Sequence, residues 1–397
     1  LSEPPTGSKV LENKIEQFMH KALILARRAE GAVLPNPMVG ALLVKNGMLI
    51  GEGWHACYGG IHAEEAALNN CKERGLDPAG SDLFVTLEPC SFQSKTKHNP
   101  PCTGIIVKAR ISRVFIARLD PNPRVRGEGV KVLKAAGIEV RWGILEKDAS
   151  ELNRIYEANM LRQRPYVHLK AALTLDGFLA GSDGSSRWIS CGESRSRVMK
   201  LRQEYDALLV GRGTLMADRP RLTVRDQSLP DQDNIKQPLR VILSSKGDLP
   251  EDWPIFEKSE ADVKVSGDVL VCHSRNRGDL NRIVLPGETP VEWAGITNGE
   301  DGLSLPEILG KLYSRGIHSL LVEGGGRVFQ SFLKTDLWDR LTVFQSPDFI
   351  GRGIPFCGDL GISSLSDKRV LHNQITALSG RDIEIQGDRE EYPCLQD

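Results

Sequence analysis

The chain has 397 residues, with 51 Lys and Arg against 52 Asp and Glu, so its formal net charge is −1. It is too long for one ordinary hydrophobic core, and two domains are expected. The balanced charge and an aromatic content of only 6% argue against nucleic acid or a membrane surface as a partner. No apolar run approaches the length of a membrane span, and eight cysteines do not indicate a disulfide framework in a chain of this size. We expect a soluble, globular, cytoplasmic protein with reduced thiols.

Helix-like and strand-like stretches alternate through the first half of the chain. An amphipathic pattern over residues 12–30 predicts a helix, which the prolines of residues 34–37 end. Short apolar runs at residues 39–44 and 83–87 predict buried strands. This alternation predicts βαβ units, that is, a sheet with helices on its faces.

The domain boundary is expected where a helical stretch gives way to a new strand. Residues 149–164 have a helical pattern with a charged end, Pro165 follows, and an apolar strand begins at Tyr166. We therefore divide the chain into residues 1–162 and residues 163–397. The second domain repeats the α/β alternation, with strands predicted at residues 207–210, 239–243, 269–272 and 319–322.

A set of metal-binding residue types stands in the first domain: His62, Glu64, Cys90 and Cys102. A catalytic zinc takes three protein ligands and keeps one position for water, whose pKa falls toward neutrality. A carboxylate two residues after the His would move a proton from that water to a leaving amino group. The order H-x-E, then P-C and a later Cys, is typical of nucleobase deaminases. We predict that His62, Cys90 and Cys102 bind zinc and that Glu64 is the proton shuttle.

The two cysteines of this set are unusually far apart in sequence. Eleven residues, in a loop that is polar and basic overall, separate Cys90 from Cys102, but the entropy of closing such a loop grows only with the logarithm of its length. Zinc tolerates the interval if the two sulfurs converge. His98 in this loop is an alternative third ligand, although Cys102 follows two rigid prolines and is preferred.

A glycine-rich turn follows the predicted strand at residues 319–322. Residues 324–326 are all glycine and precede a helix-like stretch at residues 327–333. Such a turn can cradle a phosphate at a helix N-terminus, and it can equally be an ordinary tight turn. It does not match G-x-G-x-x-G, so it predicts no dinucleotide fingerprint. From these residues alone the second domain is a candidate nucleotide-binding α/β domain.

The order of short motifs across both domains resembles the bifunctional deaminase–reductase family of riboflavin biosynthesis. The matching segments are residues 35–40, 53–55, 62–64, 85–91, 100–102 and 120–123 in the first domain, and residues 170–177, 188–189, 213–225 and 322–325 in the second. The resemblance implies an α/β protein with an N-terminal cytidine-deaminase-like three-layer domain and a C-terminal dihydrofolate-reductase-like domain. It also implies zinc-dependent deamination of a diaminopyrimidine that carries a ribosylamino phosphate, followed by NADPH-dependent reduction of the ribosyl chain to ribityl.

The resemblance also implies roles for individual residues. Asn36 would lie near the pyrimidine. NADPH would be lined by Trp188, Thr214, Asp218, Ser245, Gly325, Gly326, Arg327, Val328 and Phe329. The ribose-phosphate substrate would contact Lys170, Ser186, Arg202, Leu222, Arg225 and Glu323. Two departures concern substrate affinity and loop geometry: position 66 is Ala where family members often have His, and the Cys–Cys interval is longer than usual.

Two other functions compete with this reading. A nucleobase or tRNA deaminase with an accessory domain should have a basic stripe or exposed aromatic residues, which the balanced composition does not favour. A purely structural zinc would more often have four protein ligands. As partners we expect a small pyrimidine ribose phosphate and further copies of the chain in a homo-oligomer, with neither nucleic acid nor membrane.

Overall fold

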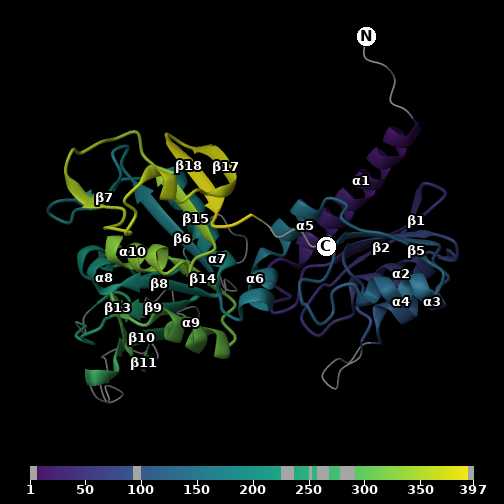
Figure 1. Cartoon of the computed structure of the whole chain (residues 1–397), viewed down its shortest axis with the longest axis horizontal. Helices are drawn as coiled ribbons and strands as arrows, with labels where there is room; N and C mark the ends of the chain where they lie inside the picture. Colours follow the sequence, from purple (N-terminus) through teal and green to yellow (C-terminus); the bar gives the residue numbers. More distant parts are fainter. Residues whose placement is uncertain are drawn as a thin grey trace, which may run out of the picture. The chain divides into compact units, whose positions relative to one another are not determined.

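The computed structural model describes residues 7–92, 100–224, 237–249, 253–256, 268–277 and 291–391. The chain divides into two compact units, the first of which ends at Arg162, while the second spans Gln163–Glu391 (Figure 1). Each unit has its own sheet and its own hydrophobic core. None of the described helices combines the length and the apolar character that crossing a membrane requires.

The first unit is built on a five-stranded sheet with the order β2-β1-β3-β4-β5. Its strands are β1 (Gly40–Lys45), β2 (Met48–Trp54), β3 (Asp82–Leu87), β4 (Arg113–Arg118) and β5 (Glu139–Arg141). Strand β1 is antiparallel to both β2 and β3, whereas β3, β4 and β5 run parallel. The carboxyl ends of β3 and β4 therefore lie side by side at one edge of the sheet.

Helices cover both faces of this sheet because successive strand residues point to opposite sides. Leu43 and Val85 pack in one core with residues of α2, α3 and α4, and Leu42 and Phe84 pack in a second core with residues of α1 and α5. The helices are α1 (Gly7–Ala26), α2 (Ala63–Glu73), α3 (Cys102–Lys108), α4 (Glu128–Ala135), α5 (Glu146–Leu152) and α6 (Arg154–Arg162). The three-layer arrangement predicted for the N-terminal domain is present.

Glycines in β2 set the distance between α2 and the sheet. A Cβ on Gly53 would lie 2.3 Å from the backbone nitrogen of Ala67 and 2.6 Å from the Cβ of Ala66, and one on Gly51 would lie 2.5 Å from the Ala67 oxygen. Only glycine permits so close an approach. The N-terminus of α2 is thereby held against the sheet, and Ala66 faces β2.

The second unit contains a nine-stranded sheet with the order β11-β10-β9-β8-β14-β6-β15-β18-β17. Its strands are β6 (Tyr166–Leu173), β8 (Ala207–Gly211), β9 (Leu239–Leu243), β10 (Val269–Ser274), β11 (Val291–Ile296), β14 (Ser319–Val322), β15 (Arg340–Gln345), β17 (His372–Ser379) and β18 (Asp382–Asp388). Neighbours are parallel from β11 to β15, and the pairs that involve β18 are antiparallel. The C-terminal hairpin thus extends a parallel sheet.

The helices of the second unit are α7 (Gly192–Glu204), α8 (Arg212–Asp218), α9 (Leu305–Ser314) and α10 (Gly326–Lys334). Apolar residues of α9 and α10 share one core with alternate residues of β6, among them Leu169 and Ala171. Of the intervening β6 residues, His168 lies 2.5 Å from the Tyr205 hydroxyl and Lys170 forms an ion pair with Glu323. Two small sheets, β7 (Phe178–Gly181) with β16 (Gly353–Pro355) and β12 (Asn298–Gly299) with β13 (Gly302–Leu303), complete the unit.

Candidate active sites

His62, Cys90 and Cys102 converge in the first unit. His62 caps the N-terminus of α2, Cys90 follows β3, and Cys102 is the first residue of α3. Their ligand atoms all lie within 4.8 Å of one another, with His62 Nδ1 at 3.1 Å from Cys102 Sγ and 3.7 Å from Cys90 Sγ. Tetrahedral zinc, with bonds of about 2.0–2.3 Å, places nitrogen and sulfur ligands about 3.6 Å apart. This donor set therefore fits zinc with three protein ligands. His98, the alternative ligand, lies outside the described residues.

The two cysteines are tied together by the start of α3. The backbone N–H of Cys102 donates to Cys90 Sγ at 3.3 Å, and the N–H of Thr103 donates to the Cys90 carbonyl at 3.2 Å. Contact with Cys90 and burial raise the pKa of the Cys102 thiol. A bound cation acts in the opposite sense and deprotonates a coordinating thiol.

Glu64 lies in the first turn of α2 beside these ligands. Its side chain is buried, and burial followed by the proximity of Cys90 raises the pKa of its carboxyl. A carboxyl group with a raised pKa takes up a proton more readily than an ordinary one and can then pass it on. Position and environment both suit a group that moves protons next to a metal.

Asn36 lies at the edge of this cluster and is oriented by His55. His55 Nδ1 is 2.9 Å from the Ile61 carbonyl, so this nitrogen donates a proton to it, and Nε2 is left to accept from Asn36 Nδ2 at 3.1 Å. Burial lowers the pKa of His55, which keeps the ring neutral. The ring centroid is 5.6 Å from that of His62. The amide oxygen of Asn36 is therefore the atom available to accept from another group.

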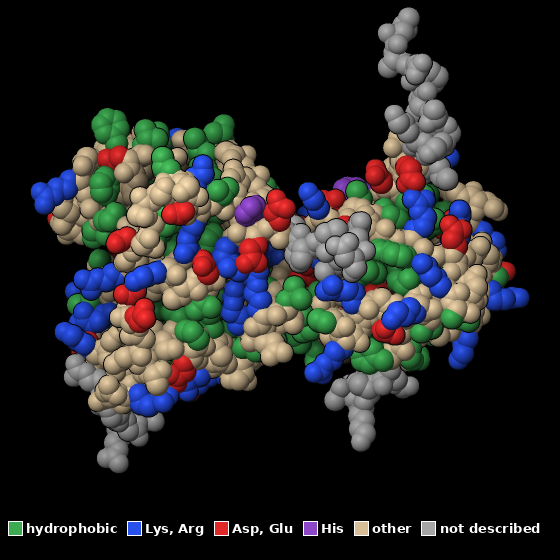
Figure 2. All heavy atoms as spheres, in the orientation of Figure 1, with side chains coloured by type: hydrophobic (Ala, Val, Ile, Leu, Met, Phe, Trp, Pro, Cys, Tyr) green, Lys and Arg blue, Asp and Glu red, His purple; other side chains and the backbone are tan. Residues whose placement is uncertain are grey.

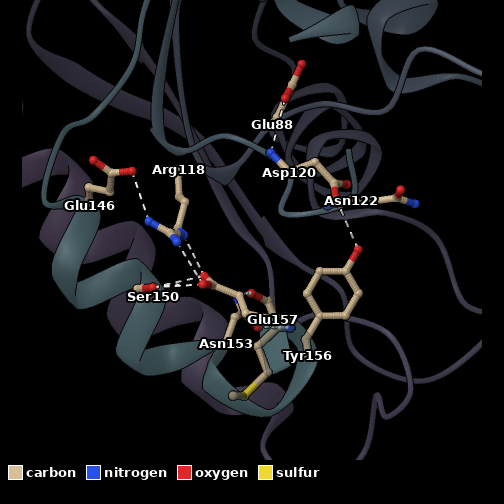
Figure 3. Close-up of polar contacts among 10 residues, drawn as sticks. Glu88, Arg118, Asp120, Asn122, Glu146, Ser150, Asn153, Tyr156 and Glu157 are labelled. Carbon is tan, nitrogen blue, oxygen red and sulfur yellow. Dashed lines mark hydrogen bonds and ion pairs between the residues drawn. The ribbon is translucent and has the colours of Figure 1, made fainter. Parts of the chain in front are cut away.

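A buried ionic network supports the strand ends behind this site. Arg118 at the end of β4 donates to Glu146 at 2.9 Å and to Glu157 at 2.8 Å, and Ser150 donates to Glu157 (Figure 3). Burial raises the pKa of Glu157 to about 7, although Arg118 acts in the opposite direction. The network fastens α5 and α6 to β4.

The second unit contains a cavity of about 1460 Å³ at the carboxyl ends of its parallel strands. The lining includes Lys170, Ser186, Trp188, Arg202, Thr214, Asp218, Leu222, Ser245, Glu323, Gly325, Gly326, Arg327, Val328 and Phe329. These are the residues singled out for this domain, except Arg225, which lies outside the described residues. Side chains spread over about 160 positions of sequence thus surround one space.

Glu323 is the centre of charge in this cavity. It follows β14 and receives a two-pronged contact from Arg202, and Lys170 Nζ lies 3.2 Å away. Burial alone would raise the pKa of Glu323, but Arg202 and Lys170 outweigh it and lower the pKa to about 2. The carboxylate is therefore ionised throughout the neutral range.

Two family models match the chain, one for each unit. Residues 165–380 match the RibD C-terminal domain, and residues 12–118 match the cytidine and deoxycytidylate deaminase zinc-binding region. The riboflavin biosynthesis protein RibD of Bacillus amyloliquefaciens is 40% identical over 372 residues, which cover 93% of this chain and 95% of that protein. The chain belongs to the RibD family.

Solved structures agree with this membership. The chain is similar to a diaminohydroxyphosphoribosylaminopyrimidine deaminase/5-amino-6-(5-phosphoribosylamino)uracil reductase from Thermotoga maritima, with a TM-score of 0.75, 35% identity and coverage of 96% of this chain and 99% of that one. It is also similar to Acinetobacter baumannii RibD, with a TM-score of 0.76, 32% identity and coverage of 95% and 99%. The predicted fold class is confirmed, as are a deaminase and a reductase of riboflavin biosynthesis with zinc and NADPH as cofactors. A nucleobase or tRNA deaminase is not favoured.

Some features of the RibD reductase cavity were not expected from the sequence. Trp188 is 67% exposed, and the guanidinium of Arg195 lies 4.4 Å from its ring centroid. Arg212 and Lys246 also line the cavity, and Arg212 is held by Asp248 at 3.0 Å. These basic residues are isolated in the sequence and have no regular spacing, so the sequence alone does not distinguish them from ordinary surface charges.

Asp176, which lies in the matching segment at residues 170–177, has the hydrogen bonds of a turn residue. It accepts from the backbone N–H of Gly351 at 2.7 Å and of Ile350 at 3.2 Å, and from the Thr174 hydroxyl at 2.6 Å. Its carboxylate therefore joins two loops.

Proposed function

We propose that the chain performs both RibD reactions, each at one of the sites described above. The first is hydrolytic deamination of 2,5-diamino-6-(5-phosphoribosylamino)pyrimidin-4-one. The second is reduction of the ribosyl chain of the deaminated product to ribityl. The observation that carries the deaminase is the convergence of His62, Cys90 and Cys102 beside the buried Glu64, and the reductase rests on the cavity of the second unit. We assign residues 1–162 to the deaminase and residues 163–397 to the reductase.

In the deaminase, His62, Cys90 and Cys102 would hold zinc, which lowers the pKa of a water that it binds. Glu64 takes a proton from the attacking water and delivers it to the amino group that leaves as ammonia. Asn36, with its amide nitrogen bonded to His55, presents its oxygen to an N–H of the pyrimidine.

In the reductase, the cavity has features that suit a dinucleotide. NADPH, which supplies the hydride, would lie along Trp188, Thr214, Asp218, Ser245 and residues 325–329. A Cβ on Gly326, at the start of the nine-residue helix α10, would lie 2.7 Å from the Pro355 oxygen. The backbone N–H groups at this helix start suit a phosphate.

The substrate would occupy the charged part of the same cavity. Lys170 and Arg202 can each face a phosphate or a sugar hydroxyl, and Glu323 can accept from an N–H or O–H group. Ser186, which donates to Asp218, and Leu222 also line this cavity. Arg225 belongs to the same set from its position in the sequence.

Mass spectrometry of the products tests the proposal. The full-length, zinc-loaded chain is incubated with the diaminopyrimidine ribosylamino phosphate, with and without NADPH. We expect the deaminated compound without NADPH, and the deaminated and reduced compound with it. Return of unchanged substrate from a zinc-loaded sample would contradict the deaminase assignment, and the Cys90–Cys102 loop and Ala66 would then be the first features to exchange.

We also infer that the protein is a cytoplasmic homo-oligomer. Strand β17 forms the edge of the nine-stranded sheet, and Leu365, Val370, Ile375 and Leu378 at or near it are at least half exposed. Apolar side chains gather on the surface in this part of the second unit (Figure 2). A second copy of the chain could pair with this edge. Sedimentation equilibrium tests the assembly: a monomer at micromolar concentration would contradict it.

The described cysteines form no disulfide, which suits a reducing compartment such as the cytoplasm.

A further inference from the structure

Glu88 stands two residues before Cys90 and has a carboxylate with an unusual set of partners. Its Oε2 accepts from the backbone N–H groups of Asp120 at 3.1 Å and Gly127 at 2.9 Å. Its Oε1 accepts from those of Gly129 at 2.9 Å and Val130 at 3.2 Å. Glu88 is 5% exposed, and among the described residues no Lys or Arg forms an ion pair with it. Figure 3 shows the contact with Asp120.

These four bonds exclude the usual roles of a carboxylate beside a metal. An ionised carboxylate has about four lone-pair sites, and each of them is engaged by a backbone donor here. Glu88 therefore has no site left for a metal or for a proton in transit. What it can do is fix one segment of backbone against another.

The segments that Glu88 joins include the peptide that carries Cys90. The side chain reaches from the end of β3 to the loop after β4 and to the first turn of α4. A Cβ on Gly129 would lie only 2.2 Å from the Pro89 carbonyl oxygen, so the α4 backbone packs directly on the peptide before Cys90. On its other side Cys90 is held by the N–H groups of Cys102 and Thr103.

We propose that Glu88 is a positioning residue of the zinc site, which acts through Cys90. Its four hydrogen bonds fix the backbone on one side of the thiolate, while the start of α3 fixes the other side. The sulfur is thereby placed within reach of His62 and Cys102 before the metal binds. The inference rests on the proposed zinc site and adds a residue that touches neither metal nor substrate.

The test is Glu88→Gln in the full-length chain. A glutamine can accept through one oxygen only, and its NH₂ group would face two N–H donors. We expect zinc to bind about 10–100-fold more weakly than in the wild type, the range typical of residues that orient metal ligands, and to be lost to a chelator correspondingly faster. We also expect the thiolate-to-cobalt charge-transfer bands of the Co²⁺-substituted protein to change. The reductase activity of the same sample should stay within twofold and reports that the second domain is intact.

Two further variants make the result decisive. Asp82→Asn exchanges a carboxylate for an amide at the opposite end of β3, where Asp82 pairs with Arg113, and should leave zinc release and the cobalt bands unchanged. If Glu88→Gln does not fold, Glu88→Asp, which keeps the charge but withdraws both oxygens by one methylene, should show faster release. Wild-type release and wild-type cobalt bands in a folded Glu88 variant would overturn the inference, even if its melting temperature fell. A wild-type protein that binds no zinc would instead refute the metal site itself.

Discussion

Arg202 of α7 and Glu323, the residue after β14, form a buried two-pronged ion pair. Arg202 Nε lies 2.6 Å from Glu323 Oε1, and Nη2 lies 3.0 Å from Oε2. Lys170 approaches the same carboxylate, so two cations share one anion at the wall of the cavity. Removing one partner of a buried pair leaves an uncompensated charge, which costs about 3–5 kcal/mol. A substitution in this cluster of Arg202, Lys170 and Glu323 should therefore change both the stability of the second unit and the charge that a substrate meets in the cavity.

We predict that Glu323→Gln lowers the free energy of unfolding of the reductase domain by about 3–5 kcal/mol at pH 7. The pKa of Glu323 falls from its usual 4.5 to about 2 in the folded chain, so its contribution is fully present above about pH 4.5. It is lost as the pH falls toward 2, because the folded carboxylate is then protonated as well. The difference in stability between wild type and variant, measured by urea unfolding, should therefore shrink between pH 4.5 and 2.

A matched control exists on the surface of the same unit. Glu292 also makes a two-pronged contact with an arginine, Arg315, but its side chain is 59% exposed. Glu292→Gln should cost less than about 1 kcal/mol. Equal losses for the two variants would show that burial of the Arg202–Glu323 pair has no energetic consequence.

We predict that Glu64→Gln lowers the deaminase kcat by about 10²–10⁴-fold, which is the usual contribution of a positioned proton-transfer group. The amide keeps the shape of the side chain but cannot take a proton. Zinc content should stay at the wild-type level, since Glu64 is not expected to be a ligand. Reduction of the already deaminated substrate should be unaffected.

Glu65, the next residue of α2, is the control for this variant. It belongs to the same helical turn but is partly exposed. Glu65→Gln should therefore retain deaminase activity. Full deaminase activity in Glu64→Gln would exclude Glu64 as the proton shuttle.

The sequence alone indicated the central strands and the set His62, Cys90 and Cys102, whose ligand atoms converge in the structure, because both depend on local pattern. Strands β9 and β14 have the predicted bounds, Leu239–Leu243 and Ser319–Val322, since continuous apolar runs are typical of buried parallel strands. The order of His, Glu and Cys residues in the first domain can be read from residue identity alone. The residues that line the cavity of the second domain follow no periodic pattern, and they were predicted from the family resemblance.

Features that depend on distant backbone could not be found in this way. The four donors of Glu88 are main-chain N–H groups 32–42 positions away, and a main-chain donor has no signature in sequence. His55 and Asn36 are partners 19 positions apart, on either side of the β1–β2 hairpin. Strand β17 was missed because it is exposed along most of its length, so it has no alternation of buried and exposed residues to detect.

We predict that Asn153→Ala raises the deaminase KM about tenfold without loss of zinc. Asn153 accepts from the backbone N–H of Met38 at 2.8 Å and donates to its carbonyl at 2.9 Å. These bonds fix the loop that carries Asn36, and each is worth about 1 kcal/mol. Steady-state kinetics on the full-length chain provide the measurement. Asn69→Ala, an exposed position on α2, is the control, and equal KM values for the two variants would contradict a role of Asn153 in loop placement.

We predict that Trp188→Ala raises the KM for NADPH about tenfold or more, because stacking of a base on an aromatic ring is worth about 1–3 kcal/mol. The exposed ring also stacks with Arg195, so the substitution removes a preformed platform. Trp188→Phe should recover part of the loss.

Trp142 offers a matched control in the first unit, where Lys134 lies 4.5 Å from its ring centroid. Trp142→Ala removes a similar exposed ring and cation pair and should leave the KM for NADPH unchanged. Titration with NADPH, followed by quenching of tryptophan fluorescence, gives the affinity without turnover. If Trp188→Ala bound NADPH as tightly as Trp142→Ala, the cofactor would have to occupy another wall of the cavity, with Arg212 and Lys246 as the next residues to exchange.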